Sequence, residues 1–471
     1  MPQTFPVTAH TKYVGPGSMF VAVKGHLLNG EDFISQAIEH GATKIVLDKT
    51  SEQLVKKFAC DGVEFIFVDD CRKSLAELSA QALGYPAKKL SIIGVTGTKG
   101  KTTTTFLVEH VLREAGYKTA LLGGVKNKIL DESEKSDLTT HGADYLQMFF
   151  TECLKRGVTH VVMEVSSHAL ALDRLHGIEF DAVGFTNLAW EHIDFHETMF
   201  KYFQAKSRIF EQVKKDGVIV INTDDKWGAL AAKKLANKKV ISLGSSFSIE
   251  KNNLDGLRIN LKNGCKPDVA ESEDWNKLEV PKLFGKFNAY NIVMAVKLCE
   301  QFGISFEKIN KALKIFSGVP GRLQKHVLKN GAVAFVDFAH NSSSMKSVLS
   351  ALRFLTNHLI VVFGCGGDRD KAKRSKMGRI ASMYGDEIIV TDDNPRHEDP
   401  LAIRQEILKG VVDKKSDSVT CVPDRHEAIA HAVACSRDGS IIAILGKGHE
   451  EYNLVRGKKY NFNDIDEIEK Y

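Results

Sequence analysis

The sequence lacks the features of secreted, membrane-spanning and nucleic-acid-binding proteins. Its eight cysteines form no C-x-x-C pair and mostly lie in or beside apolar segments, so we expect reduced structural thiols. The start, Met1-Pro2-Gln3-Thr4, has no basic stretch followed by an apolar one, and no run of about 18 apolar residues occurs. No lysine and arginine run is interleaved with aromatic residues. We therefore expect a cytoplasmic monomer whose partners are small molecules, without nucleic acid or membrane.

Length and composition are those of an ordinary multidomain protein. The 471 residues exceed what a single hydrophobic core usually supports. With 43% apolar and 26% charged residues, the chain is not disordered. The net charge of +5 is mild for this length and suggests at most sites for anionic small molecules.

Short strands rich in valine and isoleucine alternate with amphipathic helical stretches along most of the chain. This alternation indicates parallel sheets covered by helices, and hence an α/β protein. Three such series begin near residues 20, 90 and 333, while the polar segment 245–282 is expected to form antiparallel strands or loops. We predict three domains, at residues 1–88, 89–318 and 319–471.

The most specific local motif is a glycine-rich loop between an apolar strand and a helix. It reads Gly94-Val-Thr-Gly97-Thr-Lys-Gly100-Lys101-Thr102. Glycines let backbone amides approach a phosphate, Lys101 can reach the β and γ phosphates, and Thr102 can bind Mg²⁺. The strict Walker pattern needs glycine where Val95 stands, which argues against a generic GTPase. The alternative is a glycine-rich turn that binds nothing.

Polar clusters follow two later strands, where α/β sheets usually bind ligands. The first, Glu164-Val-Ser166-Ser167-His168, offers a carboxylate that, with the loop threonine, suits Mg²⁺. The second contains His192 and His196, four residues apart, but Ile193 stands where a zinc protease needs glutamate. We therefore exclude a metalloprotease. Lys206, on a predicted helix, is by itself an ordinary solvated lysine.

Several of these segments resemble the Mur ligase family. The loop Thr-Gly97-Thr-Lys-Gly100-Lys101-Thr102-Thr103 is similar to the variant phosphate loop of Mur ligases and of folylpolyglutamate synthetases, and the segment 187–194 followed by Ala-Lys206 resembles a second family motif. The resemblance covers about residues 17–450. It implies a central P-loop ATPase-like parallel sheet, flanked by an N-terminal α/β domain for the UDP-linked precursor and a C-terminal Rossmann-like domain for an amino acid.

The resemblance also implies roles for individual residues. Lys101, Lys206, Glu164 and His192 would be catalytic, and Thr102, Glu164, His192 and Lys206, carboxylated at its amine, would bind Mg²⁺. ATP would contact Gly97, Thr98, Lys99, Gly100, Lys101, Thr102, Thr103, Asn288, Asn291, Arg322 and Asp337. The precursor would contact Lys24, Thr139, Thr140, Ser167 and Arg174. The chain departs from the family at 10–12, 141, 191 and 341–342.

Three C-terminal segments resemble the family members that add diaminopimelate. They contain Arg369, then Asp393-Asn394-Pro395-Arg396, then Gly446 and Glu450, which would all bind the amino acid. Diaminopimelate differs from lysine by one carboxylate, and an arginine fork binds a carboxylate through two charge-assisted bonds. Arg396 follows a turn-forming Asn-Pro and is the expected selector. The alternative is a surface turn in which Arg396 pairs with Asp393 or Glu398.

The resemblance implies an ADP-forming ligase of peptidoglycan precursor synthesis, and hence of cell-wall growth, cell shape and division. It would join meso-2,6-diaminopimelate to the D-glutamyl γ-carboxylate of a UDP-linked muramoyl dipeptide, through an acyl phosphate and with ATP and Mg²⁺. Lysine addition and folylpolyglutamate-type ligation are alternatives within the family. A nucleotide-binding switch protein that ligates nothing is an alternative from another class.

Overall fold

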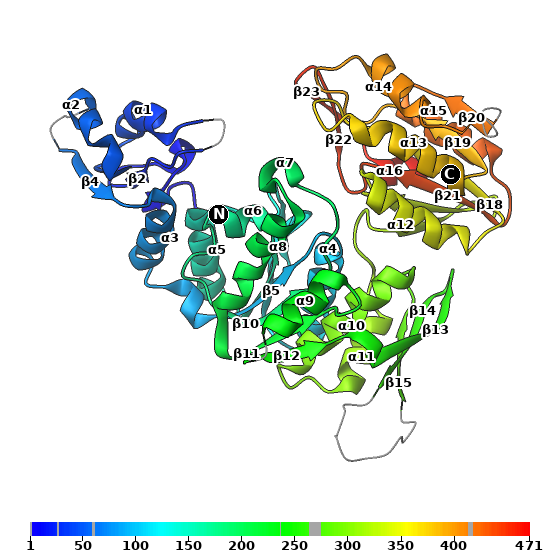
Figure 1. Ribbon diagram of the computed structural model, residues 1–471, viewed down its shortest axis with the longest axis horizontal. Coiled ribbons are helices and arrows are strands. Elements are labelled where there is room, and N and C mark those ends of the chain that lie inside the picture. Colours follow the sequence, from blue (N-terminus) through cyan, green and yellow to red (C-terminus); the bar gives the residue numbers. More distant parts are fainter. Residues whose placement is uncertain (1, 26–27, 59–61, 236, 263–274, 413–417) are drawn as a thin grey trace. The chain divides into compact units, whose positions relative to one another are not determined.

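The computed structural model describes residues 2–25, 28–58, 62–235, 237–262, 275–412 and 418–471. They form two compact units. Unit 1 comprises Met1–Gly244 and Met294–Ile309, and unit 2 comprises Ser245–Val293 and Asn310–Tyr471. The expected α/β class with parallel sheets is confirmed, and the elements can be followed in Figure 1. The domain boundaries at 88/89 and 318/319 stay predictions.

Unit 1 begins with a small parallel sheet in the order β1-β2-β3-β4. Its strands are β1 (Val7–Thr8), β2 (Met19–Val21), β3 (Lys44–Asp48) and β4 (Glu64–Val68). The helices beside it are α1 (Ile34–Glu39), α2 (Val55–Phe58) and α3 (Cys71–Ala82), with 3₁₀ turns at Thr11–Tyr13, Gly30–Phe33, Lys49–Leu54 and Pro86–Lys89. Asp70 begins α3 by accepting hydrogen bonds from the backbone amides of Arg72 and Lys73.

The larger sheet of unit 1 has the order β12-β11-β10-β5-β9-β6-β7-β8. The strands from β12 to β6 are parallel, and β7 and β8 continue the sheet antiparallel. The bounds are β5 (Ser91–Thr96), β6 (Thr119–Leu122), β7 (Lys126–Ile129), β8 (Glu132–Lys135), β9 (His160–Val165), β10 (Phe180–Phe185), β11 (Val213–Ile221) and β12 (Lys239–Ser242). The central position of β5 places its glycine-rich loop between the ends of two neighbouring strands.

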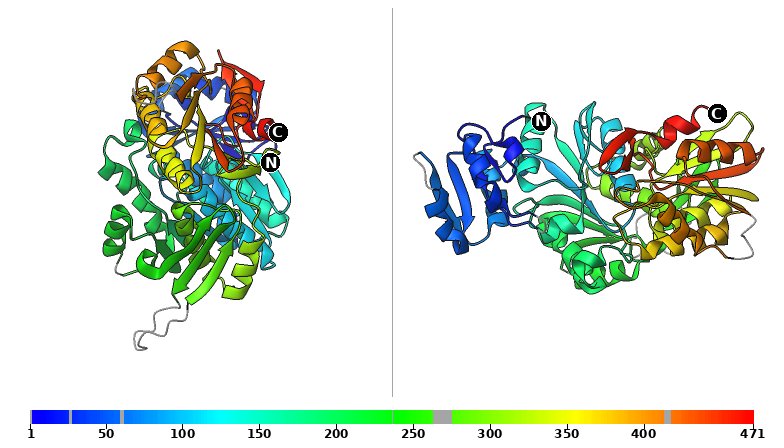
Figure 2. Two further views of the ribbon diagram at one scale, coloured as in Figure 1. Left: turned by 90° about the vertical axis from the view of Figure 1, so that its right-hand side faces the viewer. Right: turned by 90° about the horizontal axis from the view of Figure 1, so that it is seen from above.

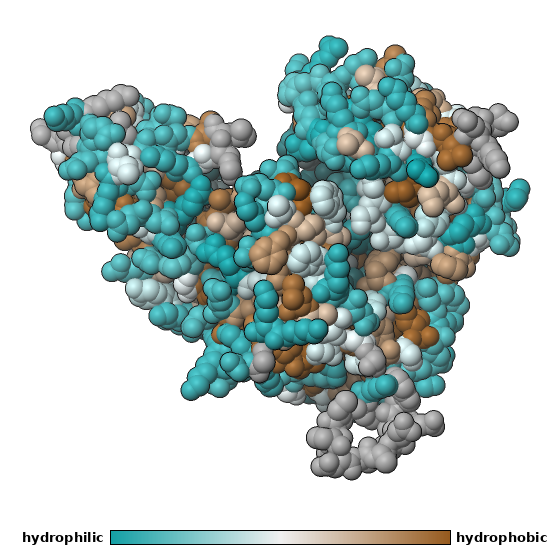
Figure 3. All heavy atoms as spheres, in the orientation of Figure 1, coloured by the Kyte–Doolittle hydropathy of each residue, from teal (hydrophilic) through white to brown (hydrophobic). Residues whose placement is uncertain are grey.

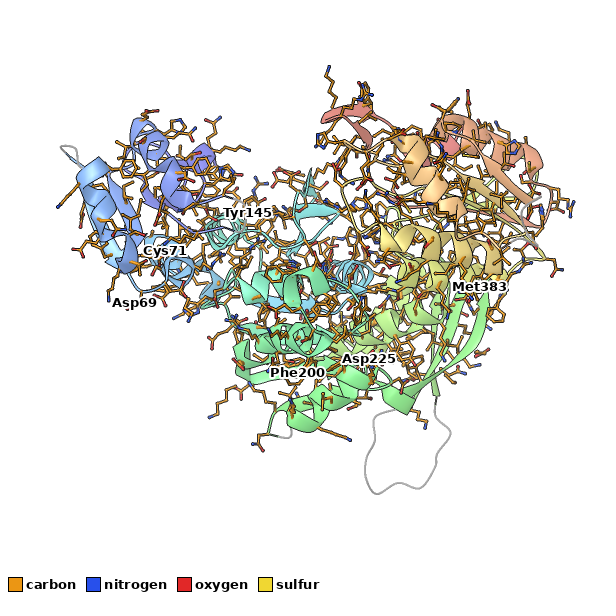
Figure 4. All side chains as sticks on the ribbon, turned by 45° about the horizontal axis from the view of Figure 1, so that its top comes forward. Asp69, Cys71, Tyr145, Phe200, Asp225 and Met383 are labelled. Atoms are coloured by element: carbon orange, nitrogen blue, oxygen red, sulfur yellow. The ribbon has the colours of Figure 1, made fainter. Side chains whose placement is uncertain are left out.

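The helices of unit 1 connect these strands. They are α4 (Lys101–Glu114), α5 (Ala143–Lys155), α6 (Ser167–Ala171), α7 (Ile193–His196), α8 (Met199–Ser207) and α9 (Lys226–Lys234), with a 3₁₀ turn at Arg208–Gln212. α5 buries Leu146, Phe149 and Phe150 in the main core of this unit. Asp225, labelled in Figure 4, begins α9 by accepting from the backbone amides of Trp227 and Gly228 at 3.1 Å.

Unit 2 contains an antiparallel sheet and a mainly parallel one. The antiparallel strands are β13 (Phe247–Asn253), β14 (Gly256–Lys262) and β15 (Trp275–Val280), preceded by a 3₁₀ turn at Gly244–Ser246. They confirm the expectation for the polar segment, although residues 263–274 lie outside the described residues. α10 (Lys286–Glu300) and α11 (Phe306–Lys314) each contribute residues to both units.

The second sheet of unit 2 has the order β16-β17-β21-β18-β19-β20, and only β16 is antiparallel to its neighbour. Its strands are β16 (Gln324–Val327), β17 (Val333–Asp337), β18 (His358–Phe363), β19 (Glu387–Val390), β20 (Val419–Cys421) and β21 (Ser440–Leu445). A separate hairpin is formed by β22 (Tyr452–Val455) and β23 (Lys458–Asn461).

Helices cover both faces of this sheet, as Figures 1 and 2 show. They are α12 (Ser342–Arg353), α13 (Ala372–Tyr384), α14 (Pro400–Leu408), α15 (Arg425–Cys435) and α16 (Asp464–Ile468). Phe335 of β17 packs in the core under α12, α13 and α14, whereas the next residue, Val336, packs in the core under α15 and α16. The strands are therefore apolar on both sides, which explains their unbroken valine and isoleucine runs.

The surface and the cysteines agree with the composition. On the face drawn in Figure 3, apolar residues are interspersed with polar ones. The six described cysteines are free, and Cys71, Cys153, Cys299 and Cys365 are buried. Cys60 and Cys265 lie outside the described residues. Within the described residues, no helix combines the length and apolar character that crossing a membrane requires.

Candidate active site

The glycine-rich loop links β5 to α4. Gly97 and Gly100 have φ angles of 145° and 85°, in the region that favours glycine. A Cβ atom on Gly97 would lie 1.9 Å from Thr186 Oγ1, so no other residue fits without displacing the chain. Gly100 begins α4 without a capping side chain. The first amides of this helix are therefore available to an anion, as predicted from the sequence.

Residues that follow β10 hold this loop in place. Thr186 Oγ1 donates to Lys99 O at 2.6 Å. Asn187 accepts from Lys99 N at 3.1 Å and donates to Lys99 O at 3.0 Å. The Lys101 ammonium donates to the carbonyls of Gly97 and Thr98, each at 3.0 Å. We assigned no role to Thr186 or Asn187 from the sequence, because their contacts with the loop depend on the pairing of β10 with β5.

Lys206, near the end of α8, is buried and not solvated. Its side chain is 1% exposed, and its ammonium donates to Gly97 O at 2.8 Å and lies 5.1 Å from the centre of the Tyr202 ring. Burial lowers the pKa of Lys206 well below its ordinary value, the charge of Lys101 lowers it further, and Glu191 opposes the shift. A larger fraction of Lys206 therefore carries a neutral amine at a given pH than is the case for a lysine on the surface.

Glu164 is the penultimate residue of β9, beside the glycine-rich loop. The register pairs it with Val95 of β5, and its carboxylate, 2% exposed, accepts from Gly124 N at 3.0 Å. A Cβ atom on Gly123 would lie 2.6 Å from Glu164 Oε1. Thr102, in the first turn of α4, is also buried. These two side chains can supply the oxygen ligands that Mg²⁺ prefers.

Three histidines gather near this strand end. The ring of His168 lies 4.8 Å from that of His192 and 5.6 Å from that of His196. Burial, with smaller contributions from nearby positive charges, lowers the pKa values of His168 and His196 to about 4. His196 Nε2 and Ser167 Oγ form a hydrogen bond of 2.9 Å. The imidazoles are therefore neutral at ordinary pH.

The predicted metal set is not a ready-made cluster of ordinary ligands. Within the described residues, no group of three or more His, Cys, Asp or Glu side chains could hold a metal ion. Of the predicted ligands, only Glu164 and His192 belong to those residue types, and Thr102 and a carboxylated Lys206 would complete the set. The absence of a cluster of ordinary ligands therefore does not contradict the predicted set of four Mg²⁺ ligands, which stays a prediction.

The residues predicted to bind the precursor mostly gather at the end of β9. Thr140 Oγ1 donates to Glu164 O at 2.9 Å and accepts from Ser166 N at 3.0 Å. Arg174 donates to Thr140 O at 2.7 Å. Thr139 Oγ1 would lie 3.3 Å from a Cβ atom on Gly124, and the Ser167 hydroxyl is held by His196.

Lys24 lies apart from this group, in the small sheet's domain. Its ammonium pairs with Ser51 Oγ at 3.4 Å and with Glu31 Oε1 at 3.5 Å. Arg72, which the sequence analysis did not select, donates to the Lys24 carbonyl. Burial and the charge of Arg72 lower the pKa of Arg174, so these guanidinium groups share one positive region.

The other predicted ATP residues belong to unit 2. Asn288 and Asn291 are buried in α10, where Asn288 donates to Phe284 O and Asn291 to Asn288 Oδ1, both at 2.9 Å. The Arg322 guanidinium lies 4.5 Å from the centre of the Phe338 ring. Asp337 accepts from the amides of Leu323 and Ala339 at 2.8 Å. The ATP roles of these four residues stay predictions.

A second polar cluster lies at the carboxyl ends of β19 and β21. Asn394, 3% exposed, donates to Glu450 Oε2 at 2.8 Å and accepts from Lys447 at 3.2 Å. Lys447 is fully buried and also donates to Tyr452 O at 2.6 Å. Burial and the charge of Asp393 raise the pKa of Glu450, whereas burial lowers that of Lys447. Lys447 was assigned no role from the sequence.

Arg396 is half-buried beside this cluster. Its φ is 53°, and its Nη1 donates to Gly367 O at 2.7 Å. In the described part of the chain it forms no ion pair with Asp393 or Glu398, the pairing of the surface-turn alternative. The Asp393 carboxylate lies against Gly446: a Cβ atom added to Gly446 would be 2.6 Å from Asp393 Oδ2.

Of the other residues predicted to bind the amino acid, Pro395 is buried and Arg369 is exposed. The carbonyl of Pro395 accepts from Glu398 N at 3.0 Å and leaves no room for a side chain on Gly367. Arg369 is exposed and donates to Asp368 O at 3.2 Å, so its predicted contact with an amino acid has no support from its neighbours.

Family models match three consecutive parts of the chain. They are described as "Mur ligase family, catalytic domain" over residues 7–82, "Mur ligase middle domain" over 95–299, and "Mur ligase, glutamate ligase domain" over 321–448.

Curated relatives match almost the whole chain. A UDP-N-acetylmuramoyl-L-alanyl-D-glutamate--2,6-diaminopimelate ligase of Clostridium botulinum is 36% identical, covering 98% of this chain and 93% of the relative. The ligase of the same name from Bacillus licheniformis is 36% identical, covering 99% and 94%.

Solved structures show the same architecture. A structure of a UDP-N-acetylmuramoyl-L-alanyl-D-glutamate--2,6-diaminopimelate ligase matches with a TM-score of 0.68 and 29% identity, covering 99% of this chain and 94% of that one. MurF ligase from Thermotoga maritima in complex with ADP matches with a TM-score of 0.64 and 17% identity, covering 99% and 97%. A Mycobacterium tuberculosis folylpolyglutamate synthase complexed with ADP and AMPPCP matches with a TM-score of 0.63 and 18% identity, covering 80% and 93%. At these last two identities the likeness shows the fold alone.

Proposed function

Because this chain belongs to the Mur ligase family, we propose that it joins meso-2,6-diaminopimelate to UDP-N-acetylmuramoyl-L-alanyl-D-glutamate in peptidoglycan precursor synthesis. ATP is converted to ADP and phosphate in the reaction. Unit 1 binds the ATP phosphates and the precursor, and the cluster at the ends of β19 and β21 in unit 2 binds diaminopimelate.

The amide bond forms in two steps. The D-glutamyl γ-carboxylate oxygen attacks the γ phosphorus of ATP, the bond to the ADP oxygen breaks, and an acyl phosphate results. The neutral amine of diaminopimelate then attacks the acyl carbon. The tetrahedral intermediate expels phosphate as its C–O bond breaks, and the nitrogen loses one proton.

The glycine-rich loop supports phosphate binding. Its glycines let backbone amides approach the anion, and the uncapped start of α4 adds partial positive charge. Among the described residues, the Lys101 ammonium hydrogen-bonds loop carbonyls and forms no ion pair, so it can turn toward the β and γ phosphates without breaking one.

Mg²⁺ fits the donor set at the end of β9. Thr102, Glu164, His192 and carboxylated Lys206 would hold it, and it would supply positive charge to the phosphate oxygens. Carboxylation requires the neutral lysine amine, which the lowered pKa of Lys206 favours. Neutral His192, with a pKa lowered by burial, has a free electron pair for a metal.

The precursor carries a diphosphate, the α- and γ-carboxylates of its D-glutamyl residue, and several hydroxyl groups. Arg174, with Arg72 close enough to influence its pKa, offers positive charge to the diphosphate. Thr139 and Ser167 offer hydroxyls near Glu164, whereas the Thr140 hydroxyl holds the backbone of Glu164 and Ser166 in place. This arrangement supports a precursor whose reactive carboxylate reaches the phosphate loop.

The observation that carries the choice of amino acid is the environment of Arg396. It is a half-buried arginine without an ion-pair partner among the described residues, close enough to the half-buried carboxylate of Glu450 for its charge to act on that group. Diaminopimelate matches this pair of charges, because its far carbon carries both a carboxylate and an ammonium. Lysine has only the ammonium and would leave the arginine unpaired.

The test is phosphate release from ATP and Mg²⁺ with the UDP-linked dipeptide and diaminopimelate, lysine or no amino acid. We expect turnover with diaminopimelate, and at least about a tenfold loss of kcat/KM in Arg396→Ala, because a charged hydrogen bond contributes about 1.5–3 kcal/mol. Arg437→Ala, which removes an exposed arginine of the same unit, is the matched control and should retain activity.

Each other outcome rejects one part of the proposal. Equal use of lysine and diaminopimelate by the wild type would reject Arg396 as the selector. Phosphate release that is independent of any amino acid would reject ligation itself.

A further inference from the structure

Arg374, in α13, is a fully buried arginine that touches no predicted substrate residue. Its two terminal nitrogens donate to both oxygens of Glu398, at 3.0 and 2.8 Å. They also donate to Glu406 at 2.8 Å and to the carbonyl of Gly366 at 3.3 Å. One guanidinium thus joins the turn after β18, the turn after β19 and helix α14.

We propose that Arg374 is the positioning residue for amino-acid selection: it holds Glu398 in a fixed pair so that the Arg396 guanidinium stays free for the far carboxylate of diaminopimelate. This inference rests on the proposed function. It concerns a residue that acts through Glu398 and Gly366 and does not itself touch the amino acid.

Without Arg374, the carboxylate of Glu398 would compete with the amino acid for Arg396. Glu398 lies two residues from Arg396, and a free carboxylate there is a ready partner for its guanidinium. Arg374 occupies both Glu398 oxygens, and Lys371 adds a contact at 3.3 Å. Hydrogen bonding to Arg374 is the main reason that the pKa of Glu398 falls to about 2. The pair hence stays ionised throughout the neutral range.

The Arg374–Glu398 pair also fixes the backbone on which the Arg396 guanidinium rests. The carbonyl that orients Arg396 belongs to Gly367, and both neighbours of Gly367 are held by the pair. Arg374 binds the carbonyl of Gly366, and Glu398 accepts from the amide of Asp368 at 2.6 Å. If Arg374 or Glu398 moves, the Gly367 carbonyl that accepts from the Arg396 guanidinium therefore moves too.

The backbone around Asp368 and Arg396 is strained and depends on outside contacts. Asp368 and Arg396 both have φ angles of 53°, which residues with a Cβ atom rarely adopt. A Cβ atom on Gly366 would lie 2.7 Å from Arg396 Nη1. Such backbone persists where surrounding contacts hold it, and the Arg374–Glu398 pair supplies those contacts.

The decisive variant is Arg374→Lys, which keeps the charge but replaces a planar fork with one ammonium. We expect the KM for diaminopimelate to rise about tenfold, with a smaller change in kcat and unchanged KM values for ATP and the precursor. The KM for lysine should not change, because lysine has no far carboxylate. The ratio of kcat/KM for diaminopimelate to that for lysine should therefore fall about tenfold.

Glu398→Gln is the second variant, and it guards against a folding defect because Glu398 is partly exposed. Its neutral amide cannot compete for Arg396, but it also cannot accept from Arg374 at both positions, so a fall in the same ratio would come from the loosened turn alone. Arg353→Lys is the matched control. Arg353 also braces chain segments, through Asp386 at 2.5 Å and Thr356 O at 2.7 Å, but near the starts of β19 and β18. It should lower the melting temperature without changing the ratio.

The outcomes separate the two proposals. If Arg374→Lys and Glu398→Gln reduce activity with both amino acids equally, or not at all, the positioning role is rejected while the ligase function stands. If the wild type shows no turnover with diaminopimelate, the proposed function fails first. Hydrogen exchange adds a readout independent of turnover: residues 364–369 should exchange faster in both variants than in Arg353→Lys.

Discussion

At the scale of single residues, the chemistry of unit 1 depends on charged groups that the protein has buried. Lys206 is 1% exposed and lies near Lys101, a second positive charge. Burial of a lysine without a carboxylate hydrogen bond costs stability, so this residue is kept for another reason. Because Lys206 donates to the carbonyl of Gly97, we infer that this reason concerns the phosphate loop.

Lys206→Met should remove activity and relieve this cost. We expect at least about a 10²-fold loss of turnover. Because the folded protein binds fewer protons at Lys206 than the unfolded chain does, the wild type becomes more stable as pH rises toward the ordinary lysine pKa of 10.5. The variant should hence be the more stable protein near pH 7, and its advantage should shrink at higher pH.

Urea unfolding at several pH values measures this difference. Lys201→Met, on the exposed side of the same helix and paired with Glu197, is the control and should show neither effect. An equal stability difference at every pH would contradict the assignment of the lowered pKa.

At the scale of elements, the phosphate loop is built from two neighbouring strand ends and not from its own sequence alone. Thr186 and Asn187 follow β10 and bind the peptide of Lys99, and Ala189 N donates to Thr98 Oγ1 at 3.0 Å. These contacts join segments about 90 positions apart, as the pairing of β10 with β5 requires.

Gly97→Ala should therefore be far more damaging than a substitution at another glycine of positive φ, just beyond the far end of α4. The new Cβ atom would lie 1.9 Å from Thr186 Oγ1, and displacing the loop by about 1 Å can reduce turnover about 10²-fold. The control is Gly116→Ala, at the other end of the helix, where φ is 96° but nothing lies within 4 Å. It should cost about 1–2 kcal/mol of stability and leave ATP use intact. Similar activity of the two variants would contradict the tight fit.

Whether a strand can be predicted from the sequence depends on how much of it is buried. Strands that are apolar on both faces, such as β5 and β18, are visible in the sequence because burial requires unbroken apolar runs. β8 and β23 were not predicted, because every residue in them is exposed and polar patterns do not separate strands from loops.

The site was predicted where local spacing defines it and missed where tertiary contacts do. Gly97 follows β5 directly, Lys101 begins the next helix, and Glu164 lies at the end of the apolar strand β9, so the surroundings of all three can be predicted from the sequence. The burial of Lys206 and of Arg374 is not, because a single basic residue on a helix looks the same whether it faces solvent or a carbonyl. The resemblance selected Lys206, but nothing in the sequence selected Arg374.

At the scale of the whole molecule, unit 1 is discontinuous in sequence. Residues 294–309 complete it: Met294 and Leu298 pack over Gly184, and the Tyr117 hydroxyl donates to Phe302 O at 2.9 Å. Leu298 is fully buried. This segment is therefore part of the core of unit 1, although β13, β14 and β15 precede it in the chain.

Leu298→Ala should lower the stability of unit 1 by about 2–5 kcal/mol, because a buried cavity replaces the side chain. Denaturant unfolding followed by the fluorescence of Trp190 and Trp227, which both belong to unit 1, measures the change. Leu28→Ala, at a leucine of the same unit that is 67% exposed, should have little effect. An unchanged midpoint for Leu298→Ala would show that unit 1 folds without this segment.

Because residues 294–309 follow residues 245–293 in the sequence, the ribosome synthesises the last part of unit 1 well after the rest of it. Translation proceeds at about 5–20 residues per second, so the ribosome needs roughly 2–10 s to add residues 245–293 after Gly244. During that interval Gly184 and the neighbouring apolar surface of unit 1 have no cover. A nascent chain with this layout is a natural client for a chaperone that shields apolar surface until the rest of α10 is synthesised.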